Sequence, residues 1–114
     1  MTARAPAPAA SPKAGKAGTM KIWIDGQFYS KEDARISVFD HGLLYGDGVF
    51  EGIRVYNRRI FRHRAHLERL YDSARALALT IPLRIEEMQQ VVEETVRRNQ
   101  REEGYIRLIV TRGA

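Results

Sequence analysis

The chain contains no cysteine and no long hydrophobic run. Without cysteine it can form neither a disulfide nor a metal site built on thiolates, and this composition favours a reducing compartment, so we expect a cytoplasmic protein. No apolar run approaches the length of a membrane-spanning helix, and we therefore expect no membrane partner. The first residues also lack the apolar segment of a secretory signal.

Acidic residues are missing from the beginning of the chain, and this explains most of its basic character. The formal net charge is +5, with a pI near 9.9, which invites a nucleic-acid interpretation. Arg4, Lys13 and Lys16, however, lie among the first 19 residues, where there is no acid. The rest of the chain carries 16 basic and 14 acidic side chains, and a net charge of +2 argues against nucleic acid as a partner.

The composition divides the chain at residue 19. Residues 1–19 are mostly Ala, Pro, Gly, Ser and Lys and hold three of the four prolines. Such a segment cannot bury enough apolar surface to offset the entropy lost on ordering, so we expect a disordered tail. Residues 20–114 are expected to form one small domain, because their length suits a single modest hydrophobic core.

The hydrophobic pattern of residues 20–114 predicts strands, then two helices, then a strand. Asp25-Gly26 suits a type I′ hairpin turn. At residues 57–59 a second hairpin is expected to turn more loosely, since a left-handed Arg58 would cost about 1 kcal/mol. The fold class is therefore α+β, an antiparallel sheet with two helices packed on it. The expected strands are 21–24, 27–29, 34–39 (strand or extended segment), 48–56, 60–61 and 105–111, and the helices are 64–79 and 85–99.

Residues 38–56 are the most informative segment, because four glycines stand there among bulky and charged side chains. Glycines this dense indicate a tight backbone or the close approach of a ligand. A nucleotide-binding loop is excluded by its context. No Gly-Lys-Ser/Thr is present, the spacing is not G-x-G-x-x-G, and a strand follows where a helix should. Composition alone therefore indicates a tight loop that leads into a strand.

The order of residues in this segment adds a family resemblance. Asp-His-Gly-Leu-Leu-Tyr-Gly-Asp-Gly-Val-Phe-Glu-Gly-Ile-Arg, residues 40–54, resembles the opening block of the class IV pyridoxal-phosphate aminotransferases, the branched-chain amino-acid group above all. This resemblance implies the small N-terminal domain of the fold-type IV architecture and pyridoxal 5'-phosphate as cofactor. It also implies transfer of the amino group of Leu, Ile or Val to 2-oxoglutarate, with amino-acid and 2-oxo-acid substrates, and a homo-oligomeric full-length enzyme, dimeric in the family.

Two other groups share this fold and remain alternatives. The D-amino-acid aminotransferases typically lack the Gly-Ile-Arg and trap the carboxylate differently on the closing strand. The aminodeoxychorismate lyases usually carry Phe-Glu-Thr at this point. Phe50-Glu-Gly-Ile-Arg54, together with Tyr105-Ile-Arg107, resembles the branched-chain group and favours it.

Arg69 is the candidate cofactor-binding residue. It lies between Leu67 and Leu70, at the margin of the apolar face of the expected helix, where a guanidinium can grip a phosphate with two hydrogen bonds. The residues alone favour an ordinary surface salt bridge. The run His-Leu-Glu-Arg-Leu-Tyr-Asp-Ser-Ala, residues 66–74, resembles the family's helix with its phosphate-binding arginine, which implies that role for Arg69. His63 and His66 could share a metal, but no acid or third imidazole completes a set, so structural histidines are expected.

The substrate-binding candidates lie on the expected strands. Tyr105 and Arg107 share one face of the strand 105–111, and such polar groups need partners if they are buried. A carboxylate ligand would satisfy both. For Arg54 and Arg112, cross-strand packing and an ion pair at the rim remain open. The resemblance implies a substrate-binding set of Tyr45 and Phe50 as aromatic walls, Arg54 in support, and Tyr105 with Arg107 for carboxylates.

The lysines limit what the chain can do alone, because transamination needs a Schiff-base lysine. Lys13 and Lys16 lie in the tail, and neither Lys21 nor Lys31 matches the family's lysine motif. The resemblance implies that this lysine, and the acid that pairs with the pyridine nitrogen, belong to a larger C-terminal domain beyond residue 114. We therefore expect the 114-residue chain to end before that domain and to be inactive. A non-catalytic small-domain fragment is the alternative from another class.

Overall fold

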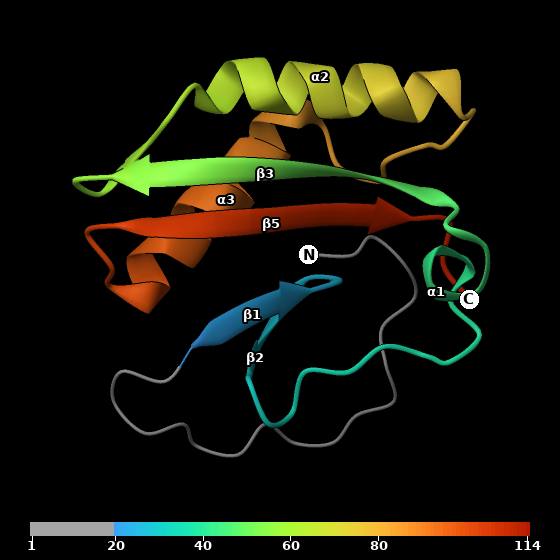
Figure 1. Cartoon of the computed structure of the whole chain (residues 1–114), viewed down its shortest axis with the longest axis horizontal. Coiled ribbons are helices and arrows are strands. Elements are labelled where there is room, and N and C mark those ends of the chain that lie inside the picture. Colours follow the sequence, from blue (N-terminus) through green and yellow to red (C-terminus); the bar gives the residue numbers. More distant parts are fainter. Residues whose placement is uncertain (1–19) are drawn as a thin grey trace.

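The computed structural model describes residues 20–114, so the tail expected over residues 1–19 lies outside the described residues. The expected α+β class is confirmed, with antiparallel sheets and one short helix that the pattern did not predict. In chain order the elements are β1 (Lys21–Ile24), β2 (Gln27–Ser30), α1 (His41–Tyr45), β3 (Gly48–Tyr56), β4 (Arg59–Ile60), α2 (His63–Ala76), α3 (Ile85–Asn99) and β5 (Gly104–Thr111) (Figure 1).

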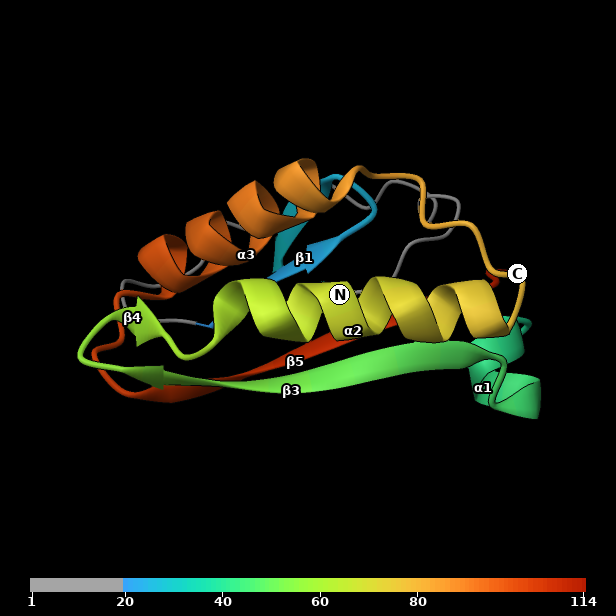
Figure 2. The same ribbon diagram turned by 90° about the horizontal axis from the view of Figure 1, so that it is seen from above.

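β3 is the centre of a three-stranded antiparallel sheet with the order β4-β3-β5. β3 and β5 pair from Gly48 opposite Thr111 to Val55 opposite Gly104. β4 pairs only with Val55 and Tyr56, so most of that edge of β3 has no strand beside it within residues 20–114. α2 and α3 both lie on one face of the sheet, and α1 lies at its end (Figure 2).

The hairpin of β1 and β2 forms a separate two-stranded sheet against α3. Asn99, the last residue of α3, attaches it by bonding the main chain of Lys21 twice. The Lys21 amide donates to Asn99 Oδ1 at 2.9 Å, and Asn99 Nδ2 donates to the Lys21 carbonyl at 3.1 Å. The Arg98 guanidinium also stacks over the Phe28 ring, 4.3 Å from its centroid. The end of α3 therefore fixes where the hairpin lies.

The hydrophobic core lies between the helices and the inner face of the sheet. Alternate residues of a strand share a face, and residues three or four apart share a face of a helix, so the buried positions follow periods of two and of three to four. This matches the sequence pattern in both strands and both helices. The fully buried apolar side chains are Ile53 from β3, Leu67 and Leu70 from α2, Met88 from α3, and Leu108 and Val110 from β5.

Both hairpins close through two-residue turns, so the looser turn expected at residues 57–59 is wrong. Asn57 and Arg58 have φ values of 49° and 63°, as Asp25 and Gly26 have 48° and 97°, and both pairs are left-handed as type I′ requires. The strained Arg58 is held by its neighbours, because its amide donates to the carbonyl of Glu102 at 2.8 Å. A tertiary hydrogen bond therefore offsets part of the local cost.

Some expected boundaries also change. Residues 34–39 form no strand. The bounds of α3, in contrast, are those that the sequence predicts. α2 runs over His63–Ala76 rather than 64–79, because Ala78 adopts a left-handed φ of 52° while the amide of Leu79 bonds the carbonyl of Ala74 at 2.8 Å. This is a Schellman ending with alanine in the usual glycine position. Within the described residues, no helix is both long enough and apolar enough to cross a membrane.

Candidate functional site

Four of the six side chains that the sequence singles out lie together on the sheet face opposite the helices. Phe50 and Arg54 belong to β3, Tyr105 and Arg107 to β5, and all four are exposed, alternating with inward-facing residues. Arg54 stands directly opposite Tyr105, and the Arg54 Cζ lies 5.7 Å from the Tyr105 ring centroid. The Arg107 Cζ lies 4.3 Å over the Phe50 ring. Such cation–π pairs hold each guanidinium over an aromatic face.

Gly52 makes room for Tyr105 at the centre of this open face. A Cβ built on Gly52 would lie 2.0 Å from the Tyr105 hydroxyl oxygen and 2.7 Å from its Cζ. The Tyr105 side chain therefore leans diagonally across β3 and occupies the space that a side chain at position 52 would fill. The glycine places the phenol at the middle of the face, next to Arg107, which is opposite Gly52 in the register.

Glu51 is the one charged residue of β3 that points toward the helices. It stands between outward-facing Phe50 and Gly52, and only 7% of its side chain is exposed. Its carboxylate accepts hydrogen bonds from Arg69 and from Nδ1 of His66, the latter at 2.7 Å. Burial by itself would raise the pKa of the Glu51 carboxyl, but the hydrogen bonds from Arg69 and His66 outweigh it and hold that pKa below its usual value.

Arg69 lies on α2 and reaches the edge of β3 through Glu51. Its Nε lies 3.0 Å from Glu51 Oε2 and its Nη2 lies 2.7 Å from Oε1, so one edge of the guanidinium is committed to the carboxylate. None of residues 20–114 bonds Nη1, and 66% of the side chain is exposed. Glu51 thus fixes the plane of the guanidinium while its other edge faces outward. The same hydrogen bond raises the pKa of Arg69 above its usual value.

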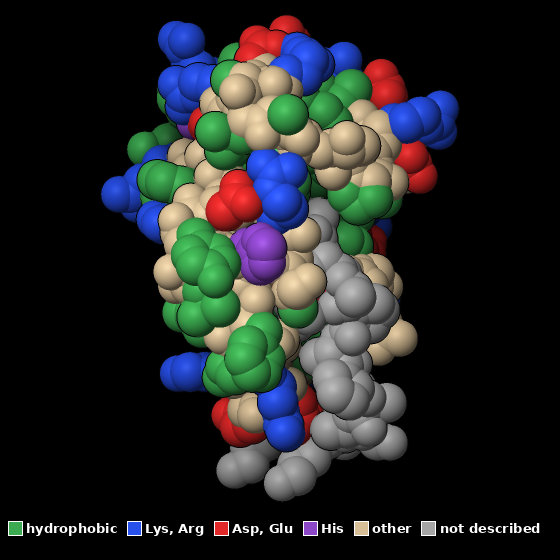
Figure 3. All heavy atoms as spheres, turned by 90° about the vertical axis from the view of Figure 1, so that its right-hand side faces the viewer, with side chains coloured by type: hydrophobic (Ala, Val, Ile, Leu, Met, Phe, Trp, Pro, Cys, Tyr) green, Lys and Arg blue, Asp and Glu red, His purple; other side chains and the backbone are tan. Residues whose placement is uncertain are grey.

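Tyr45, the sixth candidate, lies on a different element from the other five. It is the last residue of α1, where its ring meets the His41 ring edge-on at a centroid distance of 5.3 Å. Exposed hydrophobic side chains gather at this end of the molecule beside acidic, basic and histidine side chains (Figure 3). Tyr45 is nevertheless near the start of β3, because only two residues separate α1 from that strand.

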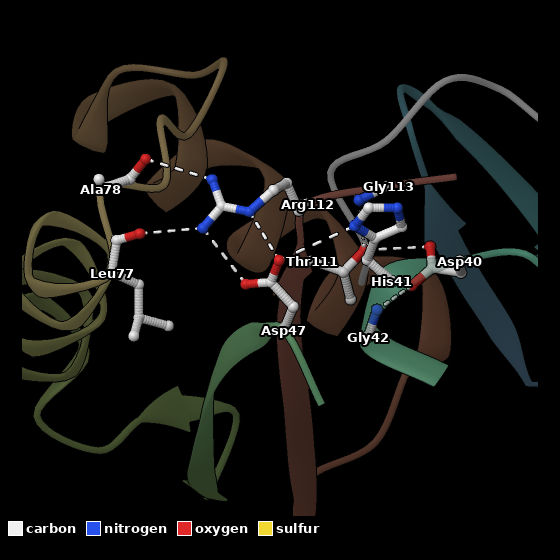
Figure 4. Close-up of polar contacts among 9 residues, drawn as sticks. All are labelled: Asp40, His41, Gly42, Asp47, Leu77, Ala78, Thr111, Arg112 and Gly113. Carbon is white, nitrogen blue, oxygen red and sulfur yellow. Dashed lines mark hydrogen bonds and ion pairs between the residues drawn. The ribbon is translucent and has the colours of Figure 1, made fainter. Parts of the chain in front are cut away.

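α1 is attached to the end of β5 by polar contacts (Figure 4). Asp40 caps the helix by accepting from the Gly42 amide at 2.8 Å, and its other oxygen accepts from the Thr111 hydroxyl at 3.0 Å. Beyond the helix, Asp47 accepts from Nε of Arg112 at 2.6 Å, and this bond holds the pKa of the Asp47 carboxyl below its usual range. The ion pair that the sequence left open for Arg112 is therefore present.

Sequence reasoning missed the partners that orient these groups. Glu51 carried a signal, because the alternation of β3 places it with Val49 and Ile53 on the buried face, where a carboxylate must find a partner. Asp40 two residues before Gly42 also suits a helix cap, but α1 is too short for a periodic pattern. No local signal identifies His66 or Thr111 as the partner, because pairing across the fold decides that.

The described residues contain no group of three or more His, Asp or Glu side chains that could hold a metal ion. His66 is instead engaged with Glu51. His63 is half-buried next to α3, and its burial lowers the pKa of the imidazole below the usual value.

The known proteins that this chain resembles are aminotransferases. Residues 48–114 match the family described as amino-transferase class IV. A protein of Methanocaldococcus jannaschii, provisionally named as a branched-chain-amino-acid aminotransferase, is 58% identical over 94 residues, which cover 82% of this chain and 33% of that protein. The D-alanine aminotransferase of Listeria monocytogenes is 38% identical over 94 residues, covering 82% of this chain and 32% of its own.

Solved structures agree with these relatives. The branched-chain aminotransferase of Thermoproteus uzoniensis, solved with norvaline, superposes with a TM-score of 0.74 at 44% identity and covers 81% of this chain and 33% of its own. The Escherichia coli branched-chain aminotransferase superposes with a TM-score of 0.78 at 36% identity, covering 83% and 33% respectively. The chain thus spans about a third of the length of the relatives it matches.

Glu51 forms a cluster with Arg69 and His66. From this cluster we predict that the free energy of unfolding depends on pH. Because the pKa of the Glu51 carboxyl is lower in the folded state than in the unfolded chain, Glu51 is protonated first in the unfolded chain as the pH falls. The contribution of Glu51 is complete above the ordinary value of 4.5 and disappears as the pH falls through the lower folded value. In urea denaturation at neutral pH, Glu51→Gln should have a lower free energy of unfolding than the wild type. The difference between the two free energies should become smaller in acid. In an Arg69→Gln background, the difference in free energy of unfolding that Glu51→Gln causes should depend less on pH, because Arg69 no longer lowers the pKa of Glu51. A difference that stays constant with pH would contradict the prediction.

Gly52→Ala should displace the Tyr105 ring from β3 at small cost to the fold. The atoms that a Cβ meets belong to the end of an exposed side chain that can swing aside, so we expect the free energy of unfolding to change by less than about 1 kcal/mol. Nuclear Overhauser contacts between the ring and β3 should disappear. Gly104→Ala is the matched control, since nothing lies within 4 Å of a Cβ there, and it should keep those contacts. Their survival in Gly52→Ala would refute the packing argument.

Proposed function

The chain belongs to the class IV aminotransferases, and on that premise we propose that it is the small N-terminal domain of a branched-chain amino-acid aminotransferase. The full-length enzyme would transfer the amino group of leucine, isoleucine or valine to 2-oxoglutarate with pyridoxal 5'-phosphate. The observation that carries the proposal is the grouping of Phe50, Arg54, Tyr105 and Arg107 on one open sheet face, with the partly exposed Arg69 held by Glu51 on the other side of β3.

The open face suits an amino acid that is anionic at one end and apolar at the other. The Arg107 guanidinium and the Tyr105 hydroxyl, which Gly52 brings to the middle of the face, can bind a carboxylate. Phe50 offers an apolar surface for an aliphatic side chain, and Arg54 stands against Tyr105 on the other side. The same site must also accept the second carboxylate of 2-oxoglutarate, which needs a cation or hydroxyl partner and which we assign to Arg107 and Tyr45.

Arg69 fits the phosphate of the cofactor. Its Nε edge is held by Glu51, so the outward edge keeps one orientation and can bind a phosphate oxygen without first paying the entropy of ordering the side chain. Glu51 directly follows Phe50 on the strand, so Arg69 and the substrate face are separated only by the thickness of β3. For both roles to hold, cofactor and substrate, joined as one molecule, must reach both sides of β3. Pyridoxal phosphate, when bound, supplies the electron sink for the reaction.

The catalytic lysine is proposed to lie outside the 114 residues. Lys21 begins β1 and lines a groove of about 410 Å³ between that strand, α3 and β5, while Lys31 lies in the turn after β2. Neither is among the four side chains of the open face or bonds Glu51, although Tyr105 and Arg107 also line the groove that Lys21 reaches. The relatives are about three times as long as the matched segment, which leaves room for a lysine-bearing domain.

Arg69→Ala should weaken binding of pyridoxal phosphate in the complete enzyme about 10- to 100-fold, the loss of a charged hydrogen-bonded contact. Binding of pyridoxal, which has no phosphate, should change little. Arg69→Lys should give an intermediate loss, because it keeps the charge without the planar fork. Arg75→Ala on the same helix is the control, since Arg75 pairs with exposed Asp72. Equal losses for pyridoxal and pyridoxal phosphate, or unchanged affinity, would refute the phosphate role.

The 114-residue chain mixed with pyridoxal phosphate should show no transaminase activity and no lysine-dependent visible absorption band. Lys21 and Lys31 are the two lysines of the described residues, and neither lies in a stretch that resembles the family's lysine motif. A band that disappears on Lys21→Arg or Lys31→Arg would overturn this expectation and bring the catalytic group into this domain.

The proposed activity is tested on the product of the complete gene. An open frame after codon 114 that encodes a lysine-bearing domain, and transfer from L-leucine to 2-oxoglutarate by the purified protein, would support the proposal. Because the D-alanine aminotransferase of Listeria monocytogenes is also 38% identical, D-alanine belongs on the substrate panel. Preference for D-alanine would establish that alternative, and a stop codon directly after codon 114 would overturn the small-domain proposal.

A further inference from the structure

α1 is held in place without hydrophobic packing. None of its five residues is buried, and Leu43, Leu44 and Tyr45 are 61%, 50% and 73% exposed. A helix of this length is not stable by itself, because a single turn gains too few hydrogen bonds to offset nucleation. Its position must therefore come from the contacts at its two ends.

The first end of α1 is attached to β5 by a buried carboxylate. Asp40 is completely buried, and its two oxygens accept from the Gly42 amide at 2.8 Å and the Thr111 hydroxyl at 3.0 Å. The His41 amide adds a backbone hydrogen bond to the carbonyl of Gly113 at 2.7 Å. A Cβ on Gly42 would lie 2.3 Å from Thr111 Cγ2, so the helix and the strand are also in tight contact. This contact fixes where α1 begins.

The second end is attached to β5 and to α2 at once. Arg112 donates from Nε to Asp47 Oδ2 at 2.6 Å and from Nη2 to Asp47 Oδ1 at 3.2 Å, a two-point ion pair. The same guanidinium donates to the carbonyl of Leu77 at 2.9 Å and to that of Ala78 at 3.3 Å, beyond the last turn of α2 (Figure 4). A cation at a helix C-terminus is favourable as well as hydrogen-bonded. Arg112 therefore joins three segments.

These three segments carry four of the six side chains proposed to bind cofactor and substrate, while Phe50 and Arg54 lie on β3. α1 ends at Tyr45, β5 carries Tyr105 and Arg107, and α2 carries Arg69. We propose that Asp40 and Arg112 are positioning residues that hold Tyr45 at the substrate side-chain pocket. They do so by fixing α1 against β5 and the end of α2. The pocket role of Tyr45 rests on the proposed function, whereas the attachment of α1 rests on the contacts alone.

The attachment is tested by amide hydrogen exchange in the 114-residue chain. Arg112→Met removes the donors and keeps the length of the side chain, and Thr111→Val removes the hydroxyl and keeps its shape. In each variant the amides of Leu44 and Gly46, which bond Asp40 and Gly42 carbonyls, should exchange at least about tenfold faster, while β3 and β5 amides keep their rates. Arg75→Met, which removes an exposed ion pair within α2, should leave α1 unchanged.

Two results would overturn the attachment. One is unchanged exchange in α1 in both variants. The other is an equal acceleration in α1, β3 and β5, which would mean that the whole domain is destabilised and that α1 is not specifically released. Using both variants covers the case in which Arg112→Met lowers global stability, since Thr111→Val leaves the Arg112 contacts in place and removes only the two hydrogen bonds of the Thr111 hydroxyl, the one to Asp40 and the one from the Gly113 amide.

The link to the pocket is tested in the complete enzyme by a double-mutant cycle. Arg112→Met should raise KM for the branched-chain amino acid about tenfold with a smaller change in kcat, and should add little in a Tyr45→Ala background. Additive effects would overturn the positioning of Tyr45 even if α1 exchanges faster. An inactive wild-type enzyme would count against the proposed function, and hydrogen exchange would still decide whether Asp40 and Arg112 hold α1.

Discussion

The pairing of β3 with β5 is the constraint on which the rest of the structure depends. Eight residue pairs in antiparallel register fix which side chains share a face, and a shift of one residue would exchange the two faces. On the inner face, Ile53 and Leu108 enter the core under the helices. On the outer face, the same ladder gathers Phe50, Tyr105 and Arg107. Core and candidate site are thus two consequences of one register.

The exception to this division is the charged residue on the inner face. Glu51 sits where an apolar side chain would pack, and its burial is tolerated because Arg69 and His66 from α2 satisfy it. The pairing attaches the helix to the strand through specific atoms instead of interchangeable methyl groups. It also orients Arg69. Asp40 is the parallel case at the end of the sheet, a buried acid whose partners set the position of a segment.

Much of the fold follows from local pattern, and the failures have local causes. The helix 85–99 and the hairpin at Asp25-Gly26 agree with the prediction because spacing and turn chemistry act within a few residues. The cost of a left-handed Arg58 predicts a looser turn. That prediction is wrong because the Arg58 amide bonds the carbonyl of Glu102, which lies in a distant segment of the chain. α1 was missed because one turn has no period, and its stability comes from contacts with residues 111–113.

The sequence alone determined the class of fold, the shared strand face of Tyr105 and Arg107, and the family block at residues 40–54, because each depends on residue order within a short stretch. Only the tertiary structure decided that Glu51 orients Arg69, that Gly52 makes space for Tyr105, and that Arg112 joins the ends of α1 and α2. These facts depend on residues up to 65 positions apart in the chain that meet only when the sheet register and helix packing are complete.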